Sequence, residues 1–444
     1  MIFPDQTTGF YFGEDHMKTA GIIVEYNPFH NGHQHHLLRT RELADADFVV
    51  AVMSGDFVQR GEPALLDKYA RAQMALSCGA DLVLELPVFF AAGSAGDFAA
   101  GAVSLLDKLG VVDALCFGSE CGRLEPLEAL AGLLAAEPPS FSRSIRQELR
   151  QGLSYPQARV RALSPLSDAG VLPLLSSPNN ILGLEYCIAL KRRRSSIRPL
   201  TLPRSGNGYH DPDLAGDGEA AFPSAFAIRR ALCGLLAEGR DPKRNPSDPD
   251  PFLPLLSGIP QAIRPFWQTL LSENRFLFPG DFTPFLKYRL LCGSPSGFSS
   301  CADVSRELSD KLRKIGTEFL DWEDLCRRLK TKELTYTRIS RALCHILLSV
   351  GRDDLARARQ QDYVPYARIL GLRRSAAELL SAIKKNSSIP LIAKLADAPA
   401  HLSEDALRLL RADVLAADLY ENVLALRRKT VPVSEYRRQL PVLP

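Results

Sequence analysis

Four of the chain's eight histidines lie close together, at His30, His33, His35 and His36. A neutral imidazole donates a hydrogen bond to an anion, and a protonated imidazole adds Coulomb attraction. His30 and His33 flank Gly32, whose missing side chain lets the backbone approach a ligand closely. This pattern predicts that the two rings stabilise negative charge developing on a phosphate group, so His30 and His33 are the candidate catalytic residues.

Two alternative roles for this histidine cluster stay open. Four imidazoles could ligate zinc, but a closed zinc site needs four convergent ligands, no cysteine pair lies nearby, and the spacing matches no zinc motif. The rings could also simply cap and solvate a helix start. His35 and His36 are more typical of a helix face than of catalysis, although one of them could contact a nucleotide. We predict no metal ligated by the protein.

Apolar runs and amphipathic stretches alternate around the histidines. Short runs rich in Val, Leu and Ile predict strands at 21–26, 48–53, 81–86 and 114–119. The stretches between them predict helices at 32–45, 65–79 and 95–110. This repetition predicts an α/β fold with a Rossmann-like, doubly wound parallel sheet.

Ligands of such sheets bind beyond the carboxyl ends of the strands. Four segments should therefore share one rim, namely 27–33, 54–61, 87–97 and 118–122. The first predicted helix begins at or just after Gly32, with Asn27 and Asn31 suited to caps, so its free N–H groups would face a bound anion.

The second half of the chain has a different character. A further helix and strand are expected at 179–193 and 196–204, and a stretch rich in Pro and Asp follows. Beyond it the patterns are helical, with helices expected at 317–330, 337–350, 375–385 and 404–429. The predicted divisions are a disordered extension at 1–16 with Met17 as the natural start, a nucleotide-binding domain at 17–236, a linker at 237–262, and a helical domain at 263–444.

Composition narrows the function classes. The chain has 444 residues and a net charge of +3, so any RNA contact must come from local patches. Its nine cysteines lack framework spacing and indicate buried, reduced thiols, which together with the lack of a signal sequence predicts a cytoplasmic protein. No apolar run approaches the roughly 18 residues that span a bilayer, so no membrane contact is expected.

Seven motifs then carry a resemblance to a known family. They are VEYNPFHNGHQHHL, VAVMSGDFVQRGEPALLDKYARAQMAL, GADLVLELPVFFA, CFGSE, SSPNNILGLEY, LPRSGNGYHD and PSAFAIRRAL. HxGH at a first strand–helix junction is the signature of the nucleotidyltransferase superfamily that includes class I aminoacyl-tRNA synthetases. The order of all seven resembles the bacterial tRNA(Met) cytidine acetate ligase family from Met17 onward, most strongly over 17–230.

This resemblance implies a two-step reaction. Members use ATP and acetate to form acetyl-adenylate and pyrophosphate, and then acetylate N4 of the wobble cytidine of elongator tRNA(Met). ATP, expected to arrive with Mg²⁺, acetate and this tRNA are therefore the implied ligands. The domain at 17–236 would activate acetate, and the helical domain at 263–444 would bind the tRNA. Oligomeric state is left open.

The resemblance also implies an ATP site. Its residues would be Ile23, Val24, Glu25, Tyr26, Asn27, Pro28, Phe29, His30, Asn31, Gly32, His33, Gln34, His35, His36, Gly118, one of Asn179 and Asn180, and Arg204. The synthetases' KMSKS loop is lacking. Ser224 and Arg229, in the segment SAFAIR, stand where a second phosphate-binding loop is expected.

RNA contacts are expected from two basic stretches. In RRLKTKELTYTRISR the candidates are Lys330, Lys332, Tyr336, Arg338 and Arg341, because basic groups with an interleaved aromatic suit phosphate contact and base stacking. In SGDFVQRGEPALLDKYAR the candidates are Arg60, Lys68 and Arg71. The alternative for all of them is a solvated helix face.

Two further functions stay open at this point. One is an adenylyl- or cytidylyltransferase that makes a dinucleotide cofactor, although the basic helical domain would then have no role. The second is a non-catalytic RNA-binding protein with a vestigial nucleotide fold. The intact HNGH at 30–33 argues against a loss of chemistry.

Overall fold

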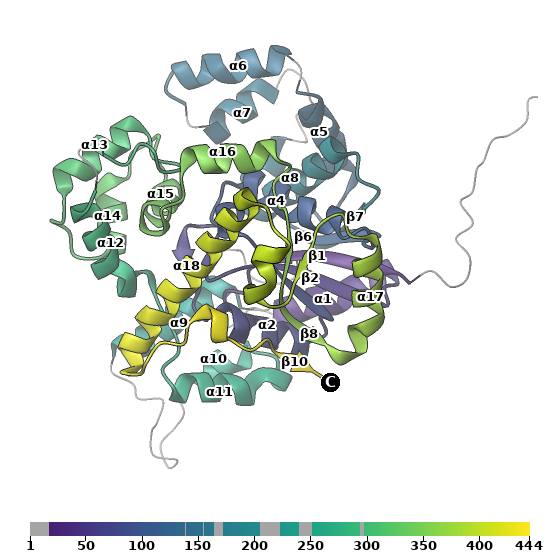
Figure 1. Cartoon of the computed structure of the whole chain (residues 1–444). Coiled ribbons are helices and arrows are strands. Elements are labelled where there is room, and N and C mark those ends of the chain that lie inside the picture. The colour runs from purple at the N-terminus through teal and green to yellow at the C-terminus, as the bar shows by residue number, and fades with distance from the viewer. Residues whose placement is uncertain are drawn as a thin grey trace, which may run out of the picture.

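A computed structural model describes residues 17–137, 139–153, 155–163, 172–204, 223–238, 251–293 and 297–444. Figure 1 shows a central sheet with helices on both faces and a group of helices, α12 to α15, at one side. The predicted extension at 1–16 and the loop that follows Arg204 lie outside the described residues.

The central sheet has eight strands in the order β10-β8-β5-β2-β1-β6-β7, with β9 beside β8. Its N-terminal strands are β1 (Thr19–Val24), β2 (Phe48–Ser54), β5 (Leu82–Leu86), β6 (Ala114–Ser119) and β7 (Arg198–Pro203). These five strands run parallel, with Ile22 of β1 opposite Ala51 of β2. The predicted doubly wound sheet is confirmed, and the strand order reverses between β1 and β6, where such sheets bind ligands.

Helices cover both faces because the strands are apolar on both faces. Val49 and Ala51 of β2 belong to one core cluster, and Val50 and Val52 belong to the other. One face carries α1 (Asn31–Ala44) and α2 (Lys68–Ser77), and the other carries α4 (Ala95–Lys108), α5 (Glu125–Ala136) and α8 (Pro178–Arg193).

A short antiparallel hairpin projects after β2. It consists of β3 (Phe57–Val58) and β4 (Glu62–Pro63). Gly61 at its tip has a φ of +72°, and a Cβ placed there would overlap the backbone of Arg341. The backbone of this hairpin therefore packs directly against the helix that carries Arg341.

The chain beyond residue 262 is mainly helical, as predicted. Its α-helices in the described residues are α11 (Arg264–Ser272), α12 (Thr283–Leu291), α13 (Arg306–Ile315), α14 (Trp322–Leu329), α15 (Tyr336–Leu348), α16 (Arg352–Gln360), α17 (Ala377–Asn386) and α18 (Glu404–Arg428). The other described helices precede residue 262 and are α3 (Val88–Ala91), α6 (Pro139–Arg150), α7 (Tyr155–Leu163), α9 (Ala225–Ala237) and α10 (Leu253–Ser257). Part of the predicted linker, α10, is helical and buries Leu255 and Leu256.

Three strands in this region were not predicted from the sequence: β8 (Ala367–Arg373), β9 (Leu391–Ile392) and β10 (Val442–Leu443). β8 runs antiparallel to β5 and extends the N-terminal sheet. The C-terminal part of the chain is thus built into that sheet rather than only attached to it. The domain boundary drawn at 237–262 stays a prediction.

Buried ion pairs hold this connection together. The Nζ of Lys68 on α2 lies 2.7 Å from Glu85 Oε1 on β5 and 2.7 Å from Glu435 Oε1 near the C-terminus. Arg368 of β8 completes the group, with its Nη1 3.0 Å from the second oxygen of Glu85. All four side chains are at least 95% inaccessible to solvent. Elements that are far apart in sequence are therefore joined by charge pairs that water does not screen.

Candidate active site

The turn between β1 and α1 forms the centre of the site. Tyr26 has a φ of +51°, and the Asn27–Pro28 peptide bond is cis. His30 is the N-cap of α1, since its Nδ1 accepts a hydrogen bond from the backbone N–H of Gly32 at 3.1 Å. The helix therefore begins at Asn31, slightly earlier than predicted, and its cap is a histidine rather than an asparagine.

The two predicted caps have different partners. Asn27 Oδ1 accepts a hydrogen bond from the Leu65 N–H at 2.7 Å, and Asn31 Nδ2 donates to the Ser257 carbonyl at 2.9 Å. Both asparagines thus hold neighbouring segments against the turn, because a free side-chain amide can satisfy backbone groups of adjacent loops.

The rings of His30 and His33 stack with centroids 3.7 Å apart. Burial, followed by the charges of Arg204 and Arg229, lowers the pKa of His30 to about 3. Burial also holds the pKa of His33 well below its usual range and lowers that of His36 to about 4. All three rings are therefore neutral at pH 7.

Neutrality fixes the tautomer of His30. Its Nδ1 accepts from Gly32, so its one proton must sit on Nε2, which is left to donate to a ligand. His33 Nδ1 and His36 Nε2 are buried and have no hydrogen-bond partner among the described residues. A buried nitrogen without a hydrogen-bond partner is costly in free energy. Donation of a ring N–H to a bound anion would satisfy such a nitrogen.

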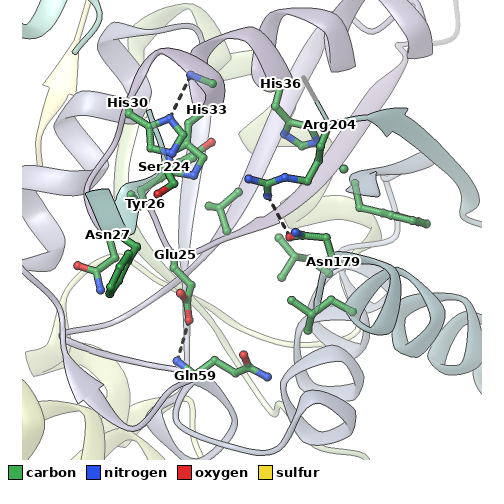
Figure 2. A pocket seen from close by; sticks show the side chains of 18 of the residues that line it. Glu25, Tyr26, Asn27, His30, His33, His36, Gln59, Asn179, Arg204 and Ser224 are labelled. Atoms are coloured by element: carbon green, nitrogen blue, oxygen red, sulfur yellow. Dashed lines mark hydrogen bonds between the residues drawn. The ribbon is translucent and has the colours of Figure 1, made fainter. Parts of the chain in front are cut away.

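A cavity of about 220 Å³ opens in front of this turn. The residues of the predicted site that line it are Ile23, Val24, Glu25, Tyr26, Asn27, His30, Gly32, His33, His35, His36, Gly118, Asn179, Arg204, Ser224 and Arg229. Arg60, predicted to contact RNA, lines it too. Figure 2 shows the stacked histidines near Ser224, with Arg204 and Asn179 across the cavity and Glu25 and Gln59 below.

Five predicted residues do not line the cavity: Pro28, Phe29, Asn31, Gln34 and Asn180. Phe29 is fully buried and packs on Tyr26 with ring centroids 4.5 Å apart. Asn180 is also buried, and its Oδ1 accepts from the Cys121 N–H at 3.1 Å. Of the two asparagines left open, Asn179 faces the cavity.

The far wall joins β6 to the end of β7. Arg204 Nη1 donates to Asn179 Oδ1 at 3.0 Å, and Asn179 Nδ2 donates to Glu120 at 2.7 Å. A Cβ on Gly118 would come within 3.3 Å of the Arg204 side chain. Glycine therefore keeps open the space between the strand end and this guanidinium group.

The remaining wall comes from the start of α9 and from the hairpin. Ser224 caps α9 by accepting from the Ala227 N–H at 3.1 Å, and Arg229 donates to the Asn27 carbonyl at 2.5 Å. The lining residues that the sequence analysis missed are Val58, Gln59, Phe98, Phe117, Leu182, Tyr186, Leu202, Pro203, Pro223, Ala225 and Phe226. Several of them carried a signal: Val58, Gln59, Phe98 and Phe117 lie in or beside segments expected at the rim, and Ala225 and Phe226 lie in the segment SAFAIR.

Two predicted RNA contacts are wrong. Lys68 is buried in the ion-pair group described above, and Arg71 is fully buried. Arg71 donates to the backbone carbonyls of Glu25 and Ser54 at 2.6 and 3.1 Å. A polyanion outside the protein cannot reach either charge. Lys68 instead joins α2 to Glu85 and Glu435, and Arg71 holds the backbone of the site.

The basic stretch at 327–341 runs from the end of α14 into the start of α15, beside the hairpin. Lys330, Lys332 and Arg338 are exposed and Tyr336 is half-buried. Arg341 is already paired, with its Nε 2.9 Å from Asp303 Oδ2. These residues therefore stay candidate RNA contacts, with Arg341 the least available of them.

The cysteines are only partly as expected. All nine are free, but Cys233 and Cys292 are exposed, and Cys121 and Cys301 are partly so. Among the described residues, no group of three or more His, Cys, Asp or Glu side chains could hold a metal ion. None of the helices in the described part of the chain combines the length and apolar character needed to cross a bilayer.

Known proteins resemble the chain over nearly its whole length. The profile of the HIGH nucleotidyl transferase family matches residues 17–432. The tRNA(Met) cytidine acetate ligase of Acetivibrio thermocellus is 40% identical over 406 residues, covering 91% of this chain and 94% of that protein. The protein of the same name from Clostridium kluyveri is 38% identical over 412 residues, with 91% and 94% covered.

Solved structures agree with the sequence relatives. Thermotoga maritima TmcAL bound with alpha-thio ATP is 30% identical and superimposes with a TM-score of 0.85, covering 96% of this chain and 100% of that one. The apo form gives a TM-score of 0.86 with the same coverage. The chain therefore belongs to the HIGH nucleotidyltransferase family and, within it, to the tRNA(Met) cytidine acetate ligases.

Proposed function

We propose that this protein is an ATP-dependent ligase that activates acetate as acetyl-adenylate and acetylates N4 of the wobble cytidine of elongator tRNA(Met). The observation that carries the proposal is the pair of stacked, neutral histidines at the N-terminus of α1, lining one cavity with Arg60, Arg204 and Arg229. Neutral donors and arginines together suit the triphosphate of ATP. The named relatives act on tRNA(Met) and acetate.

In the first step, a carboxylate oxygen of acetate attacks the α-phosphorus of ATP, and pyrophosphate leaves. The Nε2–H of His30 donates to the phosphate oxygens as their negative charge grows, assisted by the peptide N–H groups at the start of α1. Arg204 and Arg229 would hold the flanking phosphates by forked hydrogen bonds. Magnesium is expected to arrive with ATP and would neutralise part of the triphosphate charge.

In the second step, the exocyclic amine of cytidine attacks the acetyl carbonyl and AMP leaves. An adenylate is needed because acetate itself is a poor acyl donor. The start of α15 contacts the hairpin that lines the cavity, since Ser340 donates a hydrogen bond to the Gly61 carbonyl at 2.9 Å. The tRNA would therefore reach the cavity along this helix start. Arg338 and Tyr336 lie on the same helix, close to this contact.

Two assays on the purified protein test the proposal. The first is ATP–pyrophosphate exchange with and without acetate, and the second is transfer of labelled acetate to an unmodified elongator tRNA(Met) transcript. His30→Ala and His33→Ala should lose both activities, whereas His401→Ala, an exposed histidine away from the cavity, should keep both.

Each failure has a distinct meaning. Exchange that proceeds without acetate would favour a transferase acting on another substrate. An absence of exchange would favour a non-catalytic RNA-binding protein. Label that enters tRNA in both histidine variants would leave the activity in place and contradict the role given to the rings.

A further inference from the structure

One residue of the expected ATP site, Glu25, carries a negative charge that does not suit a triphosphate, so a contact with ATP does not explain it. Among the described residues that line the cavity, Glu25 is the only carboxylate, whereas the arginines are Arg60, Arg204 and Arg229. A carboxylate beside a triphosphate costs Coulomb energy. Such a group is expected in this site only if it serves a ligand that carries positive charge or donates a hydrogen bond.

The Glu25 side chain is fixed in place. The backbone N–H of Gln59, in the hairpin, donates to its Oε1 at 2.7 Å, and Arg71 holds the backbone of the same residue by donating to its main-chain carbonyl at 2.6 Å. The second oxygen, Oε2, has no hydrogen-bond partner among the described residues. Figure 2 shows the carboxylate at the lower end of the cavity, away from the stacked histidines and bonded to Gln59.

Part of the cavity lining is apolar or aromatic and suits a flat ring. Val58, Phe98 and Tyr186 also line the cavity. Burial, and after it the negative charge of Glu25, raises the pKa of Tyr186. Gln59 and Arg60 belong to the hairpin that contacts α15.

We propose that Glu25 is the catalytic residue of the transfer step, accepting a hydrogen bond from the N4 amine of the target cytidine and then taking its proton. This inference rests on the proposed function. The N4 electron pair forms a bond to the acetyl carbonyl carbon, the bond from that carbon to the AMP oxygen breaks, and AMP leaves with its electrons. One N4 proton passes to Glu25 Oε2 and then to water, so no other reactant is needed.

The same contact would select the base. Cytosine presents an N4–H₂ donor, which a carboxylate accepts, whereas uracil presents the O4 acceptor at that position. A carboxylate and O4 would repel each other, so uridine is rejected by an unfavourable contact and not only by a missing one. The amine that reacts is thereby the group that is recognised.

The test compares the two half-reactions in Glu25→Gln, which keeps the shape of the side chain and can still accept from Gln59. Acetate-dependent ATP–pyrophosphate exchange should stay within about threefold of wild type, whereas acetyl transfer to tRNA should fall by about 10²-fold or more. Labelled acetyl-adenylate should accumulate on the variant enzyme during the reaction and be recovered by acid quench. Glu25→Asp should restore part of the transfer rate.

Two further measurements separate chemistry from structure. Glu62→Gln removes a carboxylate from the same hairpin that does not line the cavity, and both activities should be kept. A transcript with uridine in place of the wobble cytidine should compete several-fold better against Glu25→Gln than against wild type, because an amide can donate to O4.

A parallel loss of exchange and transfer in Glu25→Gln would overturn the proposal and place Glu25 with the phosphates or their magnesium. Unchanged transfer would overturn it as well. If the wild-type protein forms acetyl-adenylate but acetylates no tRNA, the proposed function fails, and this inference fails with it. A failure confined to the Glu25 comparison leaves the proposed function intact.

Discussion

His30 uses its two nitrogens for different purposes. Nδ1 caps α1 through the Gly32 N–H, and Nε2 keeps the proton that faces the cavity. Replacement by alanine removes both contacts, whereas asparagine is a good N-cap that lacks the imidazole donor. Comparing the two substitutions at position 30 therefore separates the stability of the helix start from the catalytic role of the imidazole.

We predict that His30→Ala and His30→Asn each lower the rate of ATP–pyrophosphate exchange by about 10²- to 10³-fold, the usual cost of one lost transition-state donor. Only His30→Ala should also lose about 1 kcal/mol of unfolding free energy, because only alanine lacks a cap. Exchange kinetics and urea denaturation measure the two effects. Full exchange activity in His30→Asn would show that the cap, not the donor, matters.

The buried, neutral state of His30 predicts an acid-sensitive fold. Its pKa is lowered to about 3, below the value of about 6.5 expected in the unfolded chain. Between these values the unfolded chain binds more protons, so unfolding free energy falls as pH drops, by up to about 1.4 kcal/mol per pH unit from this residue. Urea denaturation from pH 7 to pH 4 should show a shallower loss in His30→Asn, and equal slopes would contradict the assignment.

Residue types alone gave a partial account of the site. The cluster at 30–36 predicted a phosphate site, since a glycine and histidines follow an apolar strand at an expected helix start, but a zinc site and a capping role stayed open. The protonation state was left open because it depends on burial and on Arg204 and Arg229, which come from distant segments. Lys68 and Arg71 were misassigned for the same reason, since their burial depends on tertiary packing: one of the two carboxylates that pair with Lys68 is Glu435, far along the chain.

At the scale of elements, the hairpin β3–β4 links the cavity to the helical region. Trp322 Nε1 donates to Ser340 Oγ at 3.1 Å, and this hydroxyl donates to the Gly61 carbonyl at 2.9 Å. Val58, Gln59 and Arg60 therefore owe their positions partly to α14 and α15.

Gly61→Ala should disturb this link. A Cβ would overlap the Arg341 backbone, and the φ of +72° disfavours any side chain. We expect slower acetyl transfer and a lower unfolding temperature. Gly132→Ala, at an exposed helix position where a Cβ meets nothing within 4 Å, is the matched control and should be neutral or slightly stabilising. Normal transfer in Gly61→Ala would show that the helical region does not position the hairpin.

The buried ion pairs should be costly to break. Glu435→Gln leaves Lys68 and Arg368 with one carboxylate between them, and we expect a loss of about 3–5 kcal/mol of unfolding free energy. Glu404→Gln breaks the exposed pair with Arg411 and should change stability by less than about 1 kcal/mol. Guanidinium denaturation followed by circular dichroism distinguishes them. Equal effects would contradict the role given to the buried group.

Periodicity predicted five strands of the sheet and the helices α14, α15, α17 and α18 to within about five residues, because buried strands and amphipathic helices leave strong patterns. It did not predict α11, α12, α13 and α16. β8 was missed although YARILGL at 366–372 is apolar. It stands between helices, and nothing local indicates that its partner is β5, because only tertiary pairing brings these distant segments together. The same limit hid Tyr186, a cavity residue that looks like any other apolar position of α8.

Over the whole molecule, exposed basic side chains should set the affinity for tRNA. We predict that Lys330→Glu and Arg338→Glu weaken tRNA binding and each lower the salt slope of log K by about 1, without changing ATP–pyrophosphate exchange. Lys384→Glu, on α17 away from α14 and α15 in Figure 1, is the control for charge alone. Filter binding across salt concentrations measures the slopes, and equal losses in all three variants would contradict a local patch.

The position of β8 bears on how the protein is made. Ribosomes synthesise β1, β2 and β5 early, but the strand that covers the β5 edge emerges much later, as does Glu435, the second carboxylate of the buried ion-pair group. An unpaired strand edge and an incomplete group of buried charges disfavour a finished fold in a nascent chain. We expect the nucleotide site to mature only after Glu435 has left the ribosome. A stop codon shortly before that residue would then yield an aggregating fragment rather than a domain that hydrolyses ATP without acetylating tRNA.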